Sequence, residues 1–541
     1  MGCAGVSNSK ESNFIKTIKL NPNELSKLRE TALSQSKIEN DYMVMSKLSE
    51  YLNTKVYLVK NTSNKKDYHM KVIKRNKETE QPEYVLSISQ VRKLSHPCCQ
   101  TVLDFYEDEV NFYMITDIPR GKELFETMRD YYNFSESTAG KIFSQLASLM
   151  YYLHSRNLFH GHLRPEILNI ESESKANFLA HKNVNDKDMN FQLYLNDYGE
   201  MLSFSGNYLE EVKNLEKVSK PYYTAPEVLK NKGYTDKVDV FAAGVILYTL
   251  FCGKPPFYGL NNVEIKQSIM EGDWEFDGSE WKDVSSAAKD LITRMLNPNP
   301  NKRISSKDIL VHTWVVYSKE EESYTKNVQN SVMDNLSKFH ARDQLQKATM
   351  SFVVNQVANS SQVKELKKLF RSFDANNDGV LSYEEFSIGY INMYGRGLSG
   401  LELHKLIEEI DKDKSGKIEY EEFLAATIEH SKVINDQNLK AAFQKFDTDG
   451  SGKLSVEELT GLVGNDLDLV MELLNKADKN NDGELEFDEF KELMTKMIGE
   501  KEKTKKSSSK TKKDKKKRKS KKDINVEEKE DKKDKNKEEE E

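Results

Sequence analysis

The chain has 541 residues, which at about 150 residues per domain predicts three or four folded units. Hydrophobic residues make up 37% of the sequence and charged residues 31%, a balance that excludes wholesale disorder. The net charge is −7, and the longest apolar run, residues 240–252, falls short of the about 18 residues needed to span a bilayer. Four cysteines without a CxxC pair and an N-terminus without a secretory h-region indicate a reducing interior, so we expect a cytoplasmic protein.

The N-terminal leader, residues 1–40, carries a pattern for lipid attachment. Removal of Met1 would expose Gly2 followed by Cys3, which resembles an N-myristoylation site beside a palmitoylation site. Val6 stands where such sites favour serine or threonine, so an unmodified flexible start is the alternative. One myristoyl chain binds membranes only marginally, so we expect membrane association only with a second signal, from Cys3 acylation or a basic segment.

Residues 41–316 are expected to form two lobes, because strand-like segments at 55–60 and 68–74 are followed by helical patterns. Motifs in this region occur in the sequence order of a eukaryotic protein kinase. They are Lys71 in a strand, HGHLRPE at 160–166, DYG at 197–199, APE at 225–227, DVF at 239–241, GKPPF at 253–257, NKRI at 301–304 and HTW at 312–314. The region resembles the kinase domain of calcium-dependent protein kinases, and the resemblance implies an α+β two-lobed fold.

The same resemblance implies a residual nucleotide and magnesium site at Lys71, Asp197 and hinge-region Glu123. The alternative is that these three residues persist only as elements of the fold. Asp197 is the only matching carboxylate for one magnesium ion instead of two, so we expect Mg-ATP to bind weakly if at all. Asp239 and Arg303 are expected to support the helical lobe rather than the chemistry.

The phosphate-binding part departs from the family pattern. The three glycine positions of the loop that should cover the phosphates hold Ser49, Tyr51 and Thr54, whose side chains hinder close approach of the backbone. The helix glutamate that should pair with the strand lysine aligns with Ser87. Glu83, one helical turn earlier, is a candidate substitute for that glutamate.

The catalytic loop departs further. His162 replaces the aspartate that orients the acceptor hydroxyl, Gly161 replaces the preceding arginine, and Ile167 replaces the magnesium-binding asparagine. Lys220 replaces a threonine normally found near the active site. Histidine can accept a proton near neutral pH, but it carries no negative charge to hold the hydroxyl, so a structural role for His162 is favoured.

Residues 317–361 form a junction with the pattern of an amphipathic helix. In the family the corresponding helix blocks the substrate site until calcium-loaded EF-hands capture it, so the resemblance implies an intramolecular latch. A plain linker helix is the alternative. The apolar stripe is Leu336, Phe339, Leu345, Phe352 and Val353, with Lys338, Arg342 and Lys347 interleaved.

Residues 362–499 contain four segments, loops 1 to 4, that match the calcium-loop pattern. Oxygen-bearing residues occupy positions 1, 3, 5 and 9, glycine position 6 and glutamate position 12, and position 7 offers a backbone carbonyl. One match alone could be a solvated turn, but four in tandem resemble calmodulin-like EF-hands, an all-α domain that binds up to four calcium ions. The predicted ligands are Asp374, Asn376, Asp378, Val380, Ser382 and Glu385; Asp411, Asp413, Ser415, Lys417, Glu419 and Glu422; Asp447, Asp449, Ser451, Lys453, Ser455 and Glu458; and Asp478, Asn480, Asp482, Glu484, Glu486 and Glu489.

Residues 500–541 form a charged tail. Residues 501–522 carry net +12 and residues 523–541 net −5, so the first 500 residues carry net −14. Almost no apolar residue interrupts the tail, so we expect it to be disordered. An anionic membrane, nucleic acid and a nuclear import receptor are candidate partners of the lysine block, and a merely solvated tail is the alternative. The lack of interleaved aromatic residues argues against base stacking on nucleic acid.

Together these features predict a calcium-responsive protein of the calcium-dependent protein kinase family. The favoured interpretation is a pseudokinase, in which four EF-hands control how a kinase-like domain meets an unknown protein partner. The alternative is an active Ser/Thr kinase that transfers the γ-phosphate of ATP to protein substrates. Five sites differ from the family pattern: the glycine loop and the positions of Ser87, His162, Ile167 and Lys220. A tenfold loss at each would lower the rate of phosphoryl transfer by about five decades.

Overall fold

The structure is a computed structural model. It describes residues 33, 37–51, 54–75, 88–131, 134–172, 191–198, 221–230, 235–318, 332, 335, 344–356, 361–394, 400–411, 414–428, 433–462 and 467–495. Within these residues, no helix has the length and apolar character needed to cross a membrane. The acylation candidates Gly2 and Cys3 and the predicted tail lie outside the described residues.

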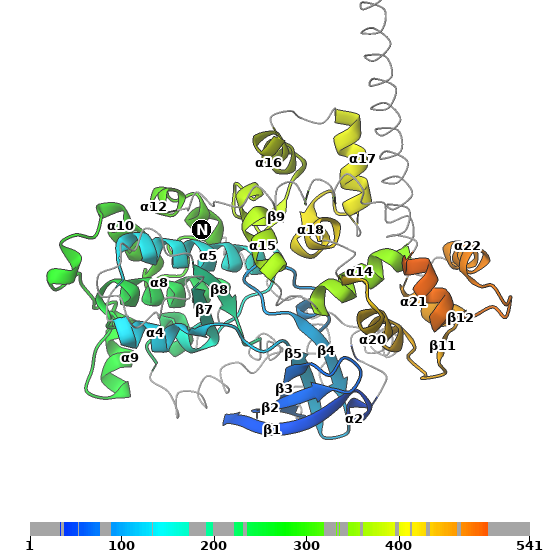
Figure 1. Cartoon of the computed structure of the whole chain (residues 1–541). Coiled ribbons are helices and arrows are strands. Elements are labelled where there is room, and N and C mark those ends of the chain that lie inside the picture. The colour runs from blue at the N-terminus through cyan, green and yellow to red at the C-terminus, as the bar shows by residue number, and fades with distance from the viewer. Residues whose placement is uncertain are drawn as a thin grey trace, which may run out of the picture. The chain divides into compact units, whose positions relative to one another are not determined.

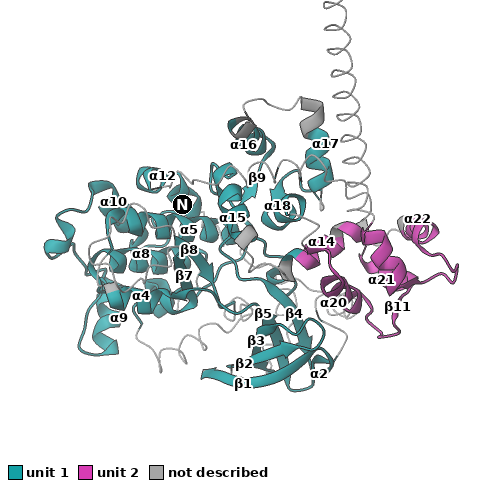
Figure 2. Ribbon diagram, in the orientation of Figure 1, with its two compact units in different colours: residues 1–339, 354–428 teal, residues 340–353, 429–541 magenta. Residues whose placement is uncertain are grey.

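The chain forms two compact units (Figure 2). The first comprises residues 1–339 and 354–428, and the second comprises residues 340–353 and 429–541. The first unit contains the two-lobed region together with loops 1 and 2, whereas the second contains loops 3 and 4. The two pairs of calcium loops therefore belong to different units.

The first lobe is built on a five-stranded antiparallel sheet in the order β1-β2-β3-β5-β4 (Figure 1). A short helix, α2 (Ile38–Asp41), leads into it. Its strands are β1 (Tyr42–Tyr51), β2 (Thr54–Asn61), β3 (Asp67–Lys74), β4 (Val102–Glu107) and β5 (Asn111–Thr116). Tyr42 packs edge to face against both Tyr68 and Tyr106 in a small separate core of this lobe, where such ring contacts add to the stabilisation from buried area.

The second lobe is helical and contributes most residues of an extended apolar core, which also includes Phe105, Phe112 and Met114 of the first lobe. Helix α8 (Lys237–Cys252) is buried along its whole length after Lys237, which is why its sequence is apolar on every side. It packs beside α5 (Glu136–Ser155), whose first turn is capped by the Ser135 hydroxyl accepting the Thr138 N–H. The other elements are β6 (Lys122–Glu123), β7 (Leu168–Ser172), β8 (Phe191–Leu195), α4 (Leu124–Tyr131), α7 (Pro226–Leu229), α9 (Asn262–Glu271), α10 (Ser286–Met295), α11 (Ser306–Leu310), α12 (Thr313–Tyr317) and two 3₁₀ turns at Pro165–Ile167 and Ser279–Trp281.

A two-stranded antiparallel bridge joins each pair of calcium loops. In the first unit β9 (Val380–Leu381) pairs with β10 (Ile418–Glu419), and in the second β11 (Lys453–Leu454) pairs with β12 (Leu485–Glu486). The helices around loops 1 and 2 are α15 (Ser361–Phe373), α16 (Tyr383–Tyr394), α17 (Gly400–Ile410) and α18 (Tyr420–Thr427). Those around loops 3 and 4 include α20 (Asp436–Phe446), α21 (Val456–Leu462) and α22 (Leu467–Ala477), and residues 487–495 after loop 4 are helical as well.

The junction contains a helix, α14 (Gln344–Gln356), of which residues 344–353 belong to the second unit. Leu345 and Val353 of the predicted apolar stripe are fully buried, and the Phe352 ring meets Phe446 of α20 edge to face at 6.1 Å. This part of the junction therefore packs on the pair of hands formed by loops 3 and 4. The remaining stripe residues, Leu336 and Phe339, lie outside the described residues.

Candidate functional site

The loop that should cover the phosphates lies at the hairpin between β1 and β2. Strand pairing runs to the hairpin tip, where Tyr51 pairs with Thr54, and two irregularities interrupt the register of β1. The three positions at which the kinase pattern requires glycine therefore lie within paired strands. Ser49 is exposed, and the side chain of Tyr51 lies outside the described part of the chain.

Two of the three predicted nucleotide-site residues lie together. The ammonium group of Lys71, on β3, forms an ion pair with the carboxylate of Asp197, which follows β8. The backbone carbonyl of Asp197 is 2.9 Å from Nε2 of His160. This arrangement keeps one cation and one carboxylate where the kinase pattern places its phosphate-pairing and metal-binding groups.

The third residue, Glu123, lies at the end of β6 and is exposed. Partial burial and the nearby carboxylates of Glu126 and Glu166 raise its pKa. Ser87 and the candidate substitute Glu83 lie outside the described residues, as does Lys220.

The catalytic loop holds His162 in a half-buried position. Its Nε2 is 3.2 Å from a guanidinium nitrogen of Arg164. Burial, with help from Arg164 and His160, holds the pKa of His162 well below its usual value. A histidine with such a low pKa is neutral at physiological pH and is a weak base. Ile167 is 3% exposed and packs in the helical core, so its position offers an apolar side chain where the pattern needs an oxygen ligand.

The backbone of the same loop remains anchored. Asp239 of α8 accepts hydrogen bonds from the backbone N–H groups of His160 and Gly161, both at 2.7 Å. Elsewhere in the lobe, the Arg303 guanidinium binds both carboxylate oxygens of Glu227 at 2.7 and 2.9 Å. The scaffold that positions a catalytic loop is therefore present, while Gly161, His162 and Ile167 stand where the kinase pattern has arginine, aspartate and asparagine.

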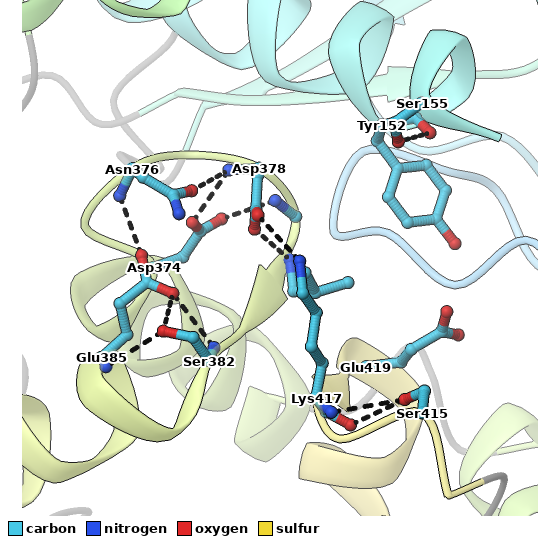
Figure 3. Close-up of polar contacts among 12 residues, drawn as sticks. Tyr152, Ser155, Asp374, Asn376, Asp378, Ser382, Glu385, Ser415, Lys417 and Glu419 are labelled. Carbon is cyan, nitrogen blue, oxygen red and sulfur yellow. Dashed lines mark hydrogen bonds and ion pairs between the residues drawn. The ribbon is translucent and has the colours of Figure 1, made fainter.

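Loop 1 is closed by its own carboxylates (Figure 3). The Asp374 carboxylate accepts the backbone N–H groups of Asp378 and Gly379 at 3.0 and 2.9 Å. The Glu385 carboxylate, at position 12, accepts the backbone N–H of Asn376 at 3.0 Å. Burial and the neighbouring Asp378 charge raise the pKa of Asp374 well above its usual value, so a bound cation would relieve real electrostatic strain.

The same closure recurs in the other loops. In all four, the position-1 aspartate accepts the backbone N–H of the position-6 glycine at 2.8–3.0 Å, and that glycine has a positive φ of 77–84°. In loop 3, oxygens of Asp447, Asp449 and Glu458 lie within 4.8 Å of one another. Converging carboxylate oxygens around a left-handed glycine fit a hard divalent cation such as calcium. Asp413 of loop 2 lies outside the described residues.

Loops 1 and 2 also contact the two-lobed region within the first unit. Arg156, after α5, forms an ion pair of 2.6 Å with Glu419, the position-9 residue of loop 2. On α15, Lys367 donates to the Pro97 carbonyl at 3.0 Å, and Arg371 donates to the side-chain carbonyls of Gln145 and Gln192. Burial lowers the pKa of Lys367 to about 7.

Sequence reasoning did not foresee this contact surface. A signal was present, because Lys364, Lys367, Lys368 and Arg371 recur at the three- and four-residue spacing of one helix face. Such a row of basic residues on a helix is usually solvated, so the pattern did not indicate a contact. The groups that these side chains bind lie in chain segments more than 170 residues earlier.

The comparisons with known proteins agree with this geometry. The family model "Protein kinase domain" matches residues 42–315, and "EF-hand domain pair" matches residues 363–428 and 436–495. "Calcium-dependent protein kinase 4" of Plasmodium falciparum (isolate 3D7) is 29% identical over 450 residues, which cover 80% of this chain and 82% of that protein.

Two further relatives support the same assignment. "Calcium-dependent protein kinase 5" of Plasmodium falciparum (isolate 3D7) is 33% identical over 417 residues, or 75% of this chain and 69% of the relative. "Calcium-dependent protein kinase 19" of Oryza sativa subsp. japonica is 30% identical over 403 residues, or 73% and 71%. The predicted fold class, a two-lobed kinase domain followed by EF-hands, is confirmed. The chain belongs to the calcium-dependent protein kinase family.

Proposed function

We propose that this family member is a calcium-operated pseudokinase, which binds a protein partner but transfers phosphate poorly or not at all. The observation that carries the proposal is His162, a half-buried imidazole with a lowered pKa at the position where the family pattern requires a carboxylate. The buried Ile167 supports it, because the second magnesium ion loses its ligand. Mg-ATP then binds weakly, through Lys71, Asp197 and Glu123 alone.

An active Ser/Thr kinase that phosphorylates protein substrates is the second candidate. The ion pair between Lys71 and Asp197 favours it, because these two groups would neutralise phosphate charge and hold one magnesium ion. The names of the relatives are those of kinases. The two candidates differ in one measurable quantity, the rate of phosphoryl transfer.

The test is transfer of labelled γ-phosphate from ATP to a basic peptide and to the protein itself, with and without calcium. We expect no transfer above that of the Asp197→Ala variant, which removes the remaining metal-binding carboxylate. Calcium-stimulated transfer that disappears in Asp197→Ala would instead support the active kinase.

The junction helix is proposed to act as an intramolecular latch that the calcium-loaded hands capture. Burial of Leu345 and Val353 and the Phe352 contact with Phe446 support this proposal. We expect protease cleavage within residues 331–361 to change when calcium replaces a chelator. An identical digestion pattern in both conditions would favour a plain linker.

A cytoplasmic protein that reaches membranes through Gly2 and Cys3 is proposed from the leader sequence, and the lysine-rich tail supplies a further attraction to anionic lipid. We expect Gly2→Ala to move the protein from the membrane fraction to the supernatant of lysed cells. Equal membrane fractions for wild type and variant would refute acylation at Gly2.

A further inference from the structure

Two lysines occupy an unexpected place in the calcium loops. Loops 2 and 3 carry Lys417 and Lys453 at position 7, whereas loops 1 and 4 carry Val380 and Glu484 there. Position 7 supplies a backbone carbonyl to a calcium ion, so calcium ligation itself does not require any particular side chain at this position. Both lysine side chains are therefore available for another role.

In each unit the position-7 lysine contacts the position-5 aspartate of the partner loop. Lys417 Nζ lies 3.4 Å from Oδ2 of Asp378 in loop 1 (Figure 3). Lys453 Nζ lies 2.5 Å from Oδ2 of Asp482 in loop 4. The same contact recurs in two units that fold around different pairs of loops, which makes it a property of the loop pairing rather than of one surface.

The contact at loop 4 is the more extensive. Lys453 Nζ also lies 3.2 Å from Oε1 of Glu486, the position-9 ligand, and 3.8 Å from Oε2 of Glu484. One ammonium group thus contacts the side chains of two predicted carboxylate ligands of the same loop, Asp482 and Glu486, and that of Glu484, whose predicted ligand atom is the backbone carbonyl. The strand pairing of Lys453 with Glu486 across β11 and β12 brings the side chain there.

The residue at position 5 explains why each lysine contacts the partner loop and not its own loop. The loops that carry the lysines have serine at position 5, Ser415 and Ser451, whereas their partners have aspartate. Each lysine therefore reaches the position-5 carboxylate across the bridge. Attraction between unlike charges at such distances persists in water, although solvent weakens it.

We propose that Lys453 and Lys417 set the calcium affinity of their partner loops, by occupying with an ammonium group the carboxylates that calcium must bind. Without calcium, each lysine offsets repulsion among the partner loop's carboxylates. When calcium binds, the lysine must either leave the partner loop's carboxylate oxygens or share them with the ion, which lowers the affinity of that loop for calcium. The effect is larger for loop 4, and the inference rests on the calcium-sensing part of the proposed function.

The test is a calcium titration of the full chain against a competing chelator, which yields the product of the stepwise binding constants. We expect Lys453→Met to raise this product about two- to fivefold and Lys417→Met by a smaller factor, below about twofold, from the strength of exposed ion pairs. Lys453→Arg, which keeps the charge, should stay near wild type. Methionine is chosen because its unbranched side chain is close to that of lysine in length and carries no charge, so packing along the strand is preserved.

Lys479→Met is the matched control, because it removes a positive charge within loop 4 whose ammonium pairs with Glu492, outside the ligand positions. A second readout is thermal unfolding in chelator, where Lys453→Met should lower Tm although it strengthens calcium binding. An unchanged or weaker affinity in Lys453→Met, or an equal gain in Lys479→Met, would overturn the inference. Absence of calcium binding in the wild type would instead overturn the proposed calcium sensing.

Discussion

We expect Arg303→Met to lower the free energy of unfolding of the helical lobe by about 3–5 kcal/mol. The Arg303 side chain is fully buried and Glu227 is 6% exposed, so their ion pair is shielded from solvent. Arg303 also donates to the backbone carbonyls of Asn297 and Lys237 at 3.0 and 2.6 Å. Removing the guanidinium would leave a buried carboxylate without its cation and take one donor away from each of the two carbonyls.

Tryptophan fluorescence during urea unfolding measures this loss selectively. The chain has three tryptophans, and all lie in the helical lobe, at Trp274, Trp281 and Trp314. Arg294→Met is the matched control, because Arg294 pairs with Asp290 on the surface, where ion pairs contribute less than about 1 kcal/mol. Equal losses in the two variants would contradict the structural role of the buried pair.

The calcium loops were the most predictable part of the chain, for a physical reason. A loop gathers its ligands from twelve consecutive residues, so their spacing alone brings Asp374 and Glu385 together. The glycine at position 6 adds a local requirement that the sequence displays directly. The apolar run at 240–252 was interpreted only as too short to span a bilayer, and the structure shows it within α8, a helix that is buried on every side.

Contacts between distant segments were not predictable in the same way. The ion pair of Arg156 with Glu419 joins residues 263 positions apart, and neither residue type nor spacing indicates the pairing. The sequence predicts that Lys453 offers its backbone carbonyl to calcium. Which residues its side chain contacts depends on the register of β11 and β12, which the sequence does not indicate. The sequence of β1 predicts a strand only weakly. Bulges interrupt the alternation of buried and exposed side chains, and the apolar residues Met43 and Met45 are exposed.

We expect that restoring two groups in the catalytic loop, with His162→Asp and Ile167→Asn, will raise phosphoryl transfer by about a hundredfold. This is the lower end of what a positioned general base contributes. The backbone of the loop is already held by Asp239, so a carboxylate at position 162 would stand on an intact scaffold, with Arg164 close by as a cation. Asparagine at position 167 would add the missing oxygen ligand for a second magnesium ion.

The control for this gain is the same double substitution combined with Asp197→Ala, which should show no transfer. The β1–β2 hairpin stays without glycine in every variant, so the rate should remain well below that of an intact kinase. Single-turnover measurements at saturating ATP separate slow chemistry from weak nucleotide binding. A wild-type protein that already transfers phosphate, and gains nothing from His162→Asp, would show that another group has taken over the task of the missing carboxylate.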